Sequence, residues 1–165
     1  MFLKYRFMMV VGLFACVGLT LWANPVLADL DDYIRKPEPN FSWKENGKSH
    51  HKSAGDLIYD LHFISQTWQG NNWQHQLQVY RPQSVAPAAM MLLWVTGGSA
   101  TPGQIAFGME LARKSKAPVA FLYHIPNQPL LEDQLVEDDL IAETFVRYLK
   151  TKDANWPLLF PMVKS

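Results

Sequence analysis

The chain has 165 residues, of which 48% are hydrophobic and 18% are charged, and its 15 basic residues balance its 15 acidic residues. This composition is typical of a globular protein and excludes an intrinsically disordered chain. The net charge is zero and basic residues form no run longer than two, which argues against binding to nucleic acid.

The first 28 residues have the features of a signal peptide. Lys4 and Arg6 precede an uncharged apolar run, Phe7 to Trp22, whose 16 residues fall short of the roughly 20 that cross a bilayer as a helix. We predict cleavage between Ala28 and Asp29, followed by export to the periplasm or the medium. Contact with a membrane is then expected only through the signal peptide before cleavage.

Cys16 is the only cysteine and leaves with the predicted signal peptide. An uncleaved membrane anchor and a lipoprotein in which Cys16 is lipidated are the alternatives to cleavage. After cleavage no cysteine remains for a disulfide, a thiolate nucleophile or a metal site. We expect neither a cofactor nor a metal ion.

Residues 33–55 are predicted to be irregular surface structure. Pro37 and Pro39 prevent a regular helix over residues 33–43, and KENGKSHHKSAG (44–55) is polar throughout. His50 and His51 are adjacent there, but no Asp, Glu or Cys stands at ligand spacing. We therefore interpret them as solvated loop residues.

Two strands are predicted next, because apolar residues recur at every second position over residues 57–67 and 73–80. A polar turn from Ser65 to Asn72 joins them, which indicates an antiparallel pair. His62 and His75 lie on these strands. We interpret both histidines as packing residues rather than catalytic ones.

A strand, a glycine turn and a helix are predicted to follow. Residues 88–95 are apolar on both faces, as in a central strand that helices cover on each side. Gly97 and Gly98 end it, and Thr101 with Gln104 has the spacing of a capping box at a helix start. The free N–H groups of this helix start lie beside the turn, where they can bind an anion or stabilise an oxyanion.

Residues 117–123 predict another buried strand and residues 135–150 a second helix. The inner face of that helix is predicted to hold Leu140, Ile141, Thr144, Phe145, Tyr148 and Leu149. The order strand, helix, strand, helix indicates parallel strands with crossover helices. The predicted fold class is α/β, an antiparallel hairpin followed by parallel strands, in one domain.

Several α/β folds place a ligand at such a turn. A dinucleotide-binding fold needs G-x-G-x-x-G and a following acid, whereas the chain carries GGSATPG and no acid at that place. A P-loop needs Lys after Gly103, where Gln104 stands instead. The α/β-hydrolase fold fits better, because its loop after the third strand donates a backbone N–H to the oxyanion hole. Gly97 and Gly98 are therefore the oxyanion-hole candidates.

A hydrolase of this fold also needs a serine in a G-x-S-x-G elbow, followed by an acid and a histidine. No serine among residues 29–165 has flanking glycines at that spacing, so no catalytic residue is assigned. Ser99 follows two glycines but begins a helix-entry loop. We interpret it as a turn or capping residue.

Four unusual sequence blocks occur in order along residues 29–165. They are LDDYIRKPEPNFSW (30–43), SQTW (65–68), IPNQPL (125–130) and WPLLFPMVKS (156–165). With them the chain resembles the PhoPQ-activated pathogenicity-related family, which implies an exported, α/β-hydrolase-like protein of poorly defined substrate. Members are longer, with a serine elbow beyond the point where this chain stops, and often have another glycine where this chain has Thr96.

The sequence therefore predicts two regions: a signal peptide (1–28) and a partial α/β-hydrolase-like domain (29–165) that is truncated before the nucleophile and without hydrolase activity alone. Strand 88–95 then lacks one neighbour, and an open apolar edge is an aggregation hazard. We expect a complementing fragment or an oligomer to cover it. The alternative is a non-enzymatic secreted interaction or virulence-associated protein on the same scaffold.

Overall fold

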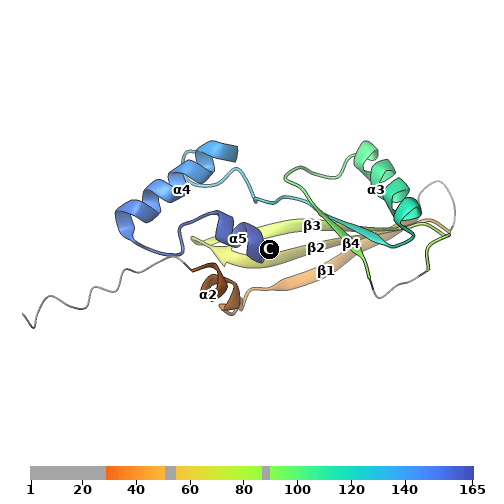
Figure 1. The fold of residues 1–165 in the computed structure, drawn as a ribbon, viewed down its shortest axis with the longest axis horizontal. Coiled ribbons are helices and arrows are strands. Elements are labelled where there is room, and N and C mark those ends of the chain that lie inside the picture. The colour runs from red at the N-terminus through yellow and green to blue at the C-terminus, as the bar shows by residue number, and fades with distance from the viewer. Residues whose placement is uncertain (1–28, 51–54, 87–89) are drawn as a thin grey trace, which may run out of the picture.

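A computed structural model describes residues 29–50, 55–86 and 90–165. The predicted signal peptide, with Ala28, and His51 lie outside these ranges. The strands are β1 (Ser42–His50), β2 (Leu57–Trp68), β3 (Asn71–Arg81), β4 (Leu92–Val95) and β5 (Val119–Leu122). The helices are α2 (Leu30–Arg35), α3 (Pro102–Ser115), α4 (Glu137–Thr151) and α5 (Leu159–Lys164). The described residues form one sheet in the order β1-β2-β3-β5-β4, drawn in Figure 1 with α3 and α4 above it.

The antiparallel hairpin β2–β3 is confirmed, but its turn is shorter than predicted. Gln69 and Gly70 alone connect the strands, and both have the positive φ angles of a two-residue hairpin turn. Ser65 and Gln66 belong to β2 and are buried. Sequence reasoning placed them in the turn because they are polar, whereas hydrogen bonds to other side chains allow their burial.

The prediction of a loop over residues 44–55 is wrong for residues 44–50, which belong to strand β1. The side chains of residues 42–49 are exposed, so this edge strand carries no alternation that the sequence could reveal. Its pairing with β2 supplies the stability instead. A short helix, α2, likewise occupies part of the region predicted to be irregular, and it ends before Pro37.

The unit β4–α3–β5 confirms the predicted parallel strands with a crossover helix. The predicted capping box is present at the start of α3. The side chain of Thr101 accepts from the N–H of Gln104, and the side chain of Gln104 accepts from the N–H of Thr101. The expected covering of both faces of strand 88–95 is wrong for β4, whereas the expected open edge is present in the described part of the chain. Within the described residues β4 lies at the sheet edge, and its side chains are exposed whereas all four of β5 are buried.

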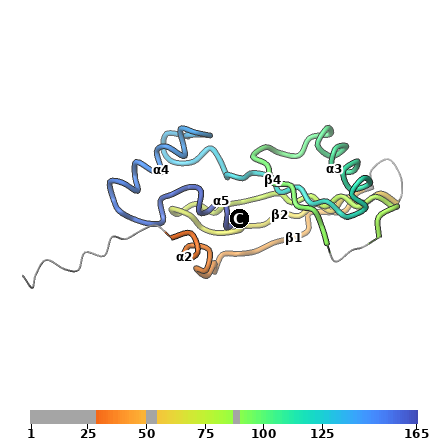
Figure 2. Tube along the Cα trace, in the orientation of Figure 1, coloured from red at the N-terminus to blue at the C-terminus, as the bar shows by residue number. Residues whose placement is uncertain are grey.

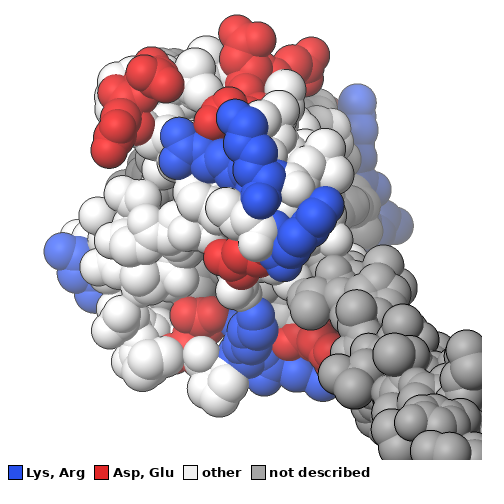
Figure 3. Space-filling model, turned by 90° about the vertical axis from the view of Figure 1, so that its left-hand side faces the viewer, with Lys and Arg blue, Asp and Glu red and all other residues white. Residues whose placement is uncertain are grey.

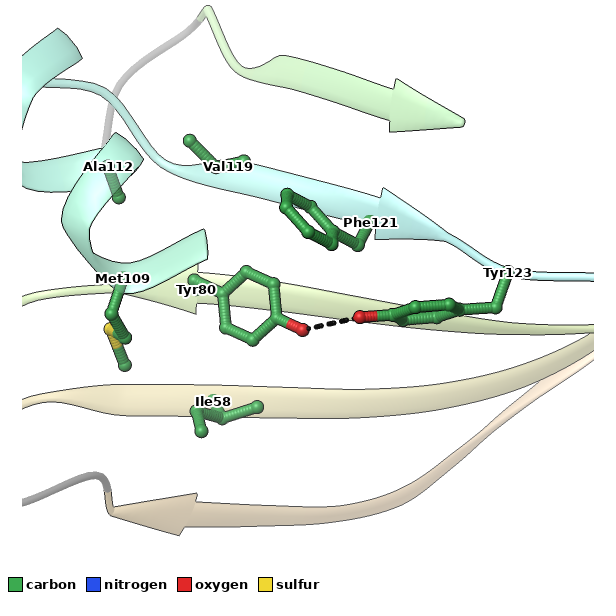
Figure 4. Close-up of a cluster of buried hydrophobic side chains, with 7 residues drawn as sticks. All are labelled: Ile58, Tyr80, Met109, Ala112, Val119, Phe121 and Tyr123. Carbon is green, nitrogen blue, oxygen red and sulfur yellow. Dashed lines mark hydrogen bonds between the residues drawn. The ribbon is translucent and has the colours of Figure 1, made fainter. Parts of the chain in front are cut away.

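Two hydrophobic clusters hold the molecule together, and their residues come from opposite ends of the hairpin β2–β3. Figure 2 traces the course of this hairpin from α3 to α4 and α5. One lies under α3 and contains Ile58, Tyr80, Met109, Ala112, Val119, Phe121 and Tyr123. Figure 4 shows the hydroxyl groups of Tyr80 and Tyr123 facing each other inside it, 2.9 Å apart. Gly108 allows α3 to approach closely, because a Cβ there would lie 2.4 Å from the Tyr80 ring.

The second cluster lies at the turn end of the hairpin, among α2, α4 and α5. Its buried members are Tyr33, Trp68, Trp73, Leu130, Leu140 and Leu158. All four sequence blocks contribute to this cluster. On α4 the predicted inner face is only partly correct, since Leu140 and Thr144 are buried but Phe145 and Leu149 are 40% and 61% exposed. Only one narrow stripe of that helix is buried, at Leu140 and Thr144.

Figure 3 shows the face of the molecule that carries this end. Basic and acidic side chains are interspersed on it, and neither sign forms a large patch. No helix in the described part of the chain is long and apolar enough to span a membrane.

Candidate functional site

The candidate site is the turn that follows β4, formed by residues 97–100. Gly97, Gly98 and Ser99 are exposed. Within the described part of the chain, the N–H groups of residues 97–100 donate no hydrogen bond, whereas the N–H of Thr101 is bonded to Gln104. The turn therefore offers a series of free backbone donors beside the start of α3. Such donors can stabilise a developing negative charge on a substrate oxygen.

The residues that follow β5 hold this turn from one side. The N–H of His124 donates to the carbonyl oxygen of Gly98 at 3.3 Å, and the N–H of Ile125 donates to that of Thr96 at 3.2 Å. The carbonyl oxygen of Ile125 would lie 3.4 Å from a Cβ added at Gly97. A Cβ at Gly97 would thus be in van der Waals contact with this oxygen.

The structure also brings together a pair that sequence reasoning missed. The Oγ of Ser99 lies 2.9 Å from Nε2 of His124, so the turn residue predicted to be structural bonds to an imidazole. Ser99 follows β4 and His124 follows β5. Because the carboxyl ends of parallel neighbours meet at one edge of a sheet, the predicted parallel order was the signal that could have placed them together.

His75 lies behind this pair, on β3, and is 1% exposed. Its Nδ1 is 3.1 Å from the carbonyl oxygen of His124, and its Nε2 is 2.8 Å from the Oγ of Ser65. Burial lowers the pKa of His75 to about 4, so the ring is neutral at pH 7. A carbonyl only accepts, so Nδ1 carries the proton and Nε2 accepts from Ser65.

His62 shows no comparable arrangement. His62 lies on β2 with its Nε2 3.2 Å from the Oε1 of Gln74 on the sheet surface. His50 ends β1, and its neighbour His51 lies outside the described residues. No group of three or more potential metal ligands occurs among the residues that the structure describes.

A separate hollow of about 410 Å³ lies beside α2, between the hairpin turn and residues 153–155. Its charged side chains already have partners. Lys36 donates to Asn155, and Glu38 pairs with Lys164 at 2.5 Å. We therefore take the glycine turn, rather than this hollow, as the candidate site.

Comparisons with known proteins agree with the sequence blocks. The sequence model of the family described as "PhoPQ-activated pathogenicity-related protein" matches residues 30–165. The chain is also similar to Autocrine proliferation repressor protein A of Dictyostelium discoideum, with 30% identity over 162 residues. The match covers 89% of this chain and 32% of that protein, so the chain spans about a third of the length of this curated relative.

Two solved chains of a glucuronoyl esterase from Solibacter usitatus also share structural similarity with the chain, each with a TM-score of 0.42. One of them is 9% identical in sequence, and the match covers 61% of this chain and 36% of the esterase chain. The other is 11% identical, and the match covers 76% of this chain and 47% of the esterase chain.

Proposed function

Because the chain belongs to the PhoPQ-activated pathogenicity-related protein family, we propose that residues 29–165 are the N-terminal part of an exported, α/β-hydrolase-like protein. In this proposal the turn at Gly97 and Gly98 supplies the backbone donors of an oxyanion hole. One observation carries it: the N–H groups of this exposed turn donate to no group among the described residues, and they lie at the carboxyl end of a parallel strand pair.

We further propose that this chain has no hydrolase activity alone. Ser99 pairs with His124, but in the described part of the chain no carboxylate bonds to that imidazole. In a catalytic triad an acid fixes the tautomer and orientation of the histidine, and stabilises the imidazolium that forms. The nucleophile and the acid would then come from a further part of a longer family protein.

The open edge of β4 supports the need for such a part. The N–H groups of Leu92 and Thr96 donate toward β5, to Pro118 and Leu122. Alternation along the strand therefore directs the N–H and C=O groups of Leu93 and Val95 to the open edge. Their side chains are 56% and 51% exposed. Another strand pairing there would satisfy the backbone groups and cover apolar surface.

An esterase assay tests the catalytic part of the proposal. The chain alone, at high concentration, is mixed with p-nitrophenyl esters of short acids, and the Ser99→Ala variant is the matched control. We expect the two proteins to release p-nitrophenol at the same background rate. Turnover that Ser99→Ala abolishes would contradict the proposal, because Ser99 would then be a sufficient nucleophile.

The DNA after the codon for Ser165 gives an independent test. A strand and a G-x-S-x-G elbow encoded there, in register or after one frameshift, would support the hydrolase-like origin. Their absence would favour the alternative, a non-enzymatic secreted interaction protein on this scaffold.

Export is tested by fractionating cells and sequencing the N-terminus of the exported protein. We propose that it begins at Asp29. The Oδ1 of Asp29 accepts from the N–H of Asp31 at 2.8 Å and so caps α2, which makes this residue a suitable start for the folded domain. Retention of residues 1–28 in the exported protein would contradict cleavage at this place.

A further inference from the structure

A chain of hydrogen bonds connects the buried interior of the hairpin to the glycine turn. It begins at Ser65 in β2, passes through both ring nitrogens of His75 and reaches the carbonyl oxygen of His124. The same residue, His124, bonds to the turn through its N–H, which donates to Gly98, and through its ring, which contacts Ser99. One residue thus joins the interior to the turn.

The backbone of His124 has a conformation that needs support. Its φ is +65°, in the left-handed region that residues other than glycine seldom adopt. A non-glycine residue stays there only where surrounding contacts fix it. The carbonyl oxygen of His124 is the group that His75 holds. This carbonyl shares its planar peptide unit with the N–H of Ile125, which donates to the carbonyl oxygen of Thr96. Rotation of this peptide would therefore break the hydrogen bond at Thr96, directly before the turn.

We propose that His75 is a positioning residue for the oxyanion-hole turn: by donating from Nδ1 to the carbonyl oxygen of His124, it fixes this left-handed residue and thereby the Gly97–Ser99 turn. This inference rests on the proposed function for its catalytic meaning, but the geometry that it describes can be tested without a substrate. His75 itself is buried and contacts no substrate, so it acts only through His124.

The chemistry of imidazole suits this position. His75 needs a donor at Nδ1 and an acceptor at Nε2, which a neutral imidazole provides in one tautomer. Phe63 packs against the ring, with the ring centroids 5.0 Å apart. The lowered pKa of His75 agrees with this arrangement, because an uncharged ring keeps Nε2 as an acceptor for the hydroxyl of Ser65 at 2.8 Å.

Two substitutions of His75 distinguish the hydrogen bond made by Nδ1 from the hydrogen bond made by Nε2. In His75→Asn the side-chain amide nitrogen can take the place of Nδ1 and still donate to His124. In His75→Gln the longer amide reaches toward Ser65 and takes the place of Nε2 instead. Both variants lose the imidazole ring and its packing. A general loss of stability should therefore affect both, and each variant serves as the matched control of the other.

The readout is amide hydrogen exchange of the full chain, measured by mass spectrometry on peptides that cover residues 119–128. We expect the amides of His124 and Ile125 to exchange roughly fivefold faster in His75→Gln, as for the loss of one typical hydrogen bond. In His75→Asn their exchange should stay within about twofold of the wild type, because the donor is retained. Equal rates in the two variants would overturn the proposal.

The tautomer of His75 can be measured in the wild-type chain, so this test does not require that the variants fold. The nitrogen chemical shifts of histidine-labelled protein report which ring nitrogen carries the proton. We expect His75 in the form protonated at Nδ1. The form protonated at Nε2 would overturn the proposal, since it cannot donate to His124. Neither readout involves ester turnover, so failure of the hydrolase-like proposal and failure of this inference are distinguishable.

Discussion

Replacing Gly108 with alanine tests the close packing of α3 on the sheet. A Cβ at this position would lie 2.4 and 2.5 Å from two ring carbons of Tyr80. Carbon atoms in contact prefer about 3.5–4.0 Å, so helix and ring must separate by about 1 Å. Tyr80 cannot move freely, because it is fully buried and its hydroxyl group bonds to Gln78 and Tyr123. Such overpacking typically costs about 1–3 kcal/mol.

Gly103→Ala on the same helix is the matched control. Its Cβ would meet no atom closer than 3.9 Å. Both substitutions gain up to about 1 kcal/mol of helix propensity, so this gain largely cancels between them. We expect Gly108→Ala to be less stable than Gly103→Ala by about 2 kcal/mol, within the usual range for overpacking. Urea unfolding followed by tryptophan fluorescence measures the difference, and a Gly108→Ala protein as stable as Gly103→Ala would refute the close approach.

Three further predictions concern the fold. His75 has a pKa of about 4 when folded against about 6.5 when unfolded, so the stability that its neutral form contributes is present above pH 6.5 and falls as pH drops toward 4, by about 3 kcal/mol. The free energy of unfolding should therefore fall less in His75→Asn over this range, and parallel pH curves would contradict the assignment. Thr101→Ala should cost about 1 kcal/mol in urea unfolding by removing the cap of α3, whereas Thr101→Ser should cost little; equal losses would argue against the capping box. Leu93→Lys should reduce binding of a hydrophobic dye more than Val163→Lys, a similarly exposed site on α5, because only the first places a charge on the β4 edge; equal reductions would disprove a role for that edge.

The sequence predicted the parts of the fold that depend on local patterns. The hairpin strands, the capped helix α3 and the buried strand β5 all carry a regular period or a capping motif, and the structure has each of them. Strand β1 carries neither, because its side chains face solvent and its stability comes from pairing with β2. The alternation of apolar and polar residues therefore could not predict β1.

The candidate site was predicted only in its backbone. The residue type of Gly97 and Gly98 predicts a turn, and the capping motif predicts the start of the helix. The pairing of Ser99 with His124 joins residues 25 positions apart and depends on the chain between them, which brings β5 beside β4. His75 is buried, as expected of a packing residue, but its link to His124 spans 49 residues and has no local signal.

The residues that reveal the family and the residues that carry the candidate chemistry occupy different places. Tyr33, Trp68 and Leu158, from three of the sequence blocks, pack together at the turn end of the hairpin. That cluster contains none of the residues of the glycine turn. The blocks are therefore recognisable because they build a tightly packed scaffold, where a change of one side chain disturbs several neighbours.

The turn has a weaker sequence pattern for the opposite physical reason. Its proposed function uses main-chain N–H groups, which every residue except proline possesses. At Gly97 a Cβ would meet only the carbonyl oxygen of Ile125, at 3.4 Å, among the described residues. Block IPNQPL begins at this same Ile125 and contributes Leu130 to the second cluster. It is thus the one block that joins the scaffold to the turn, and substitutions in it should alter the geometry of both.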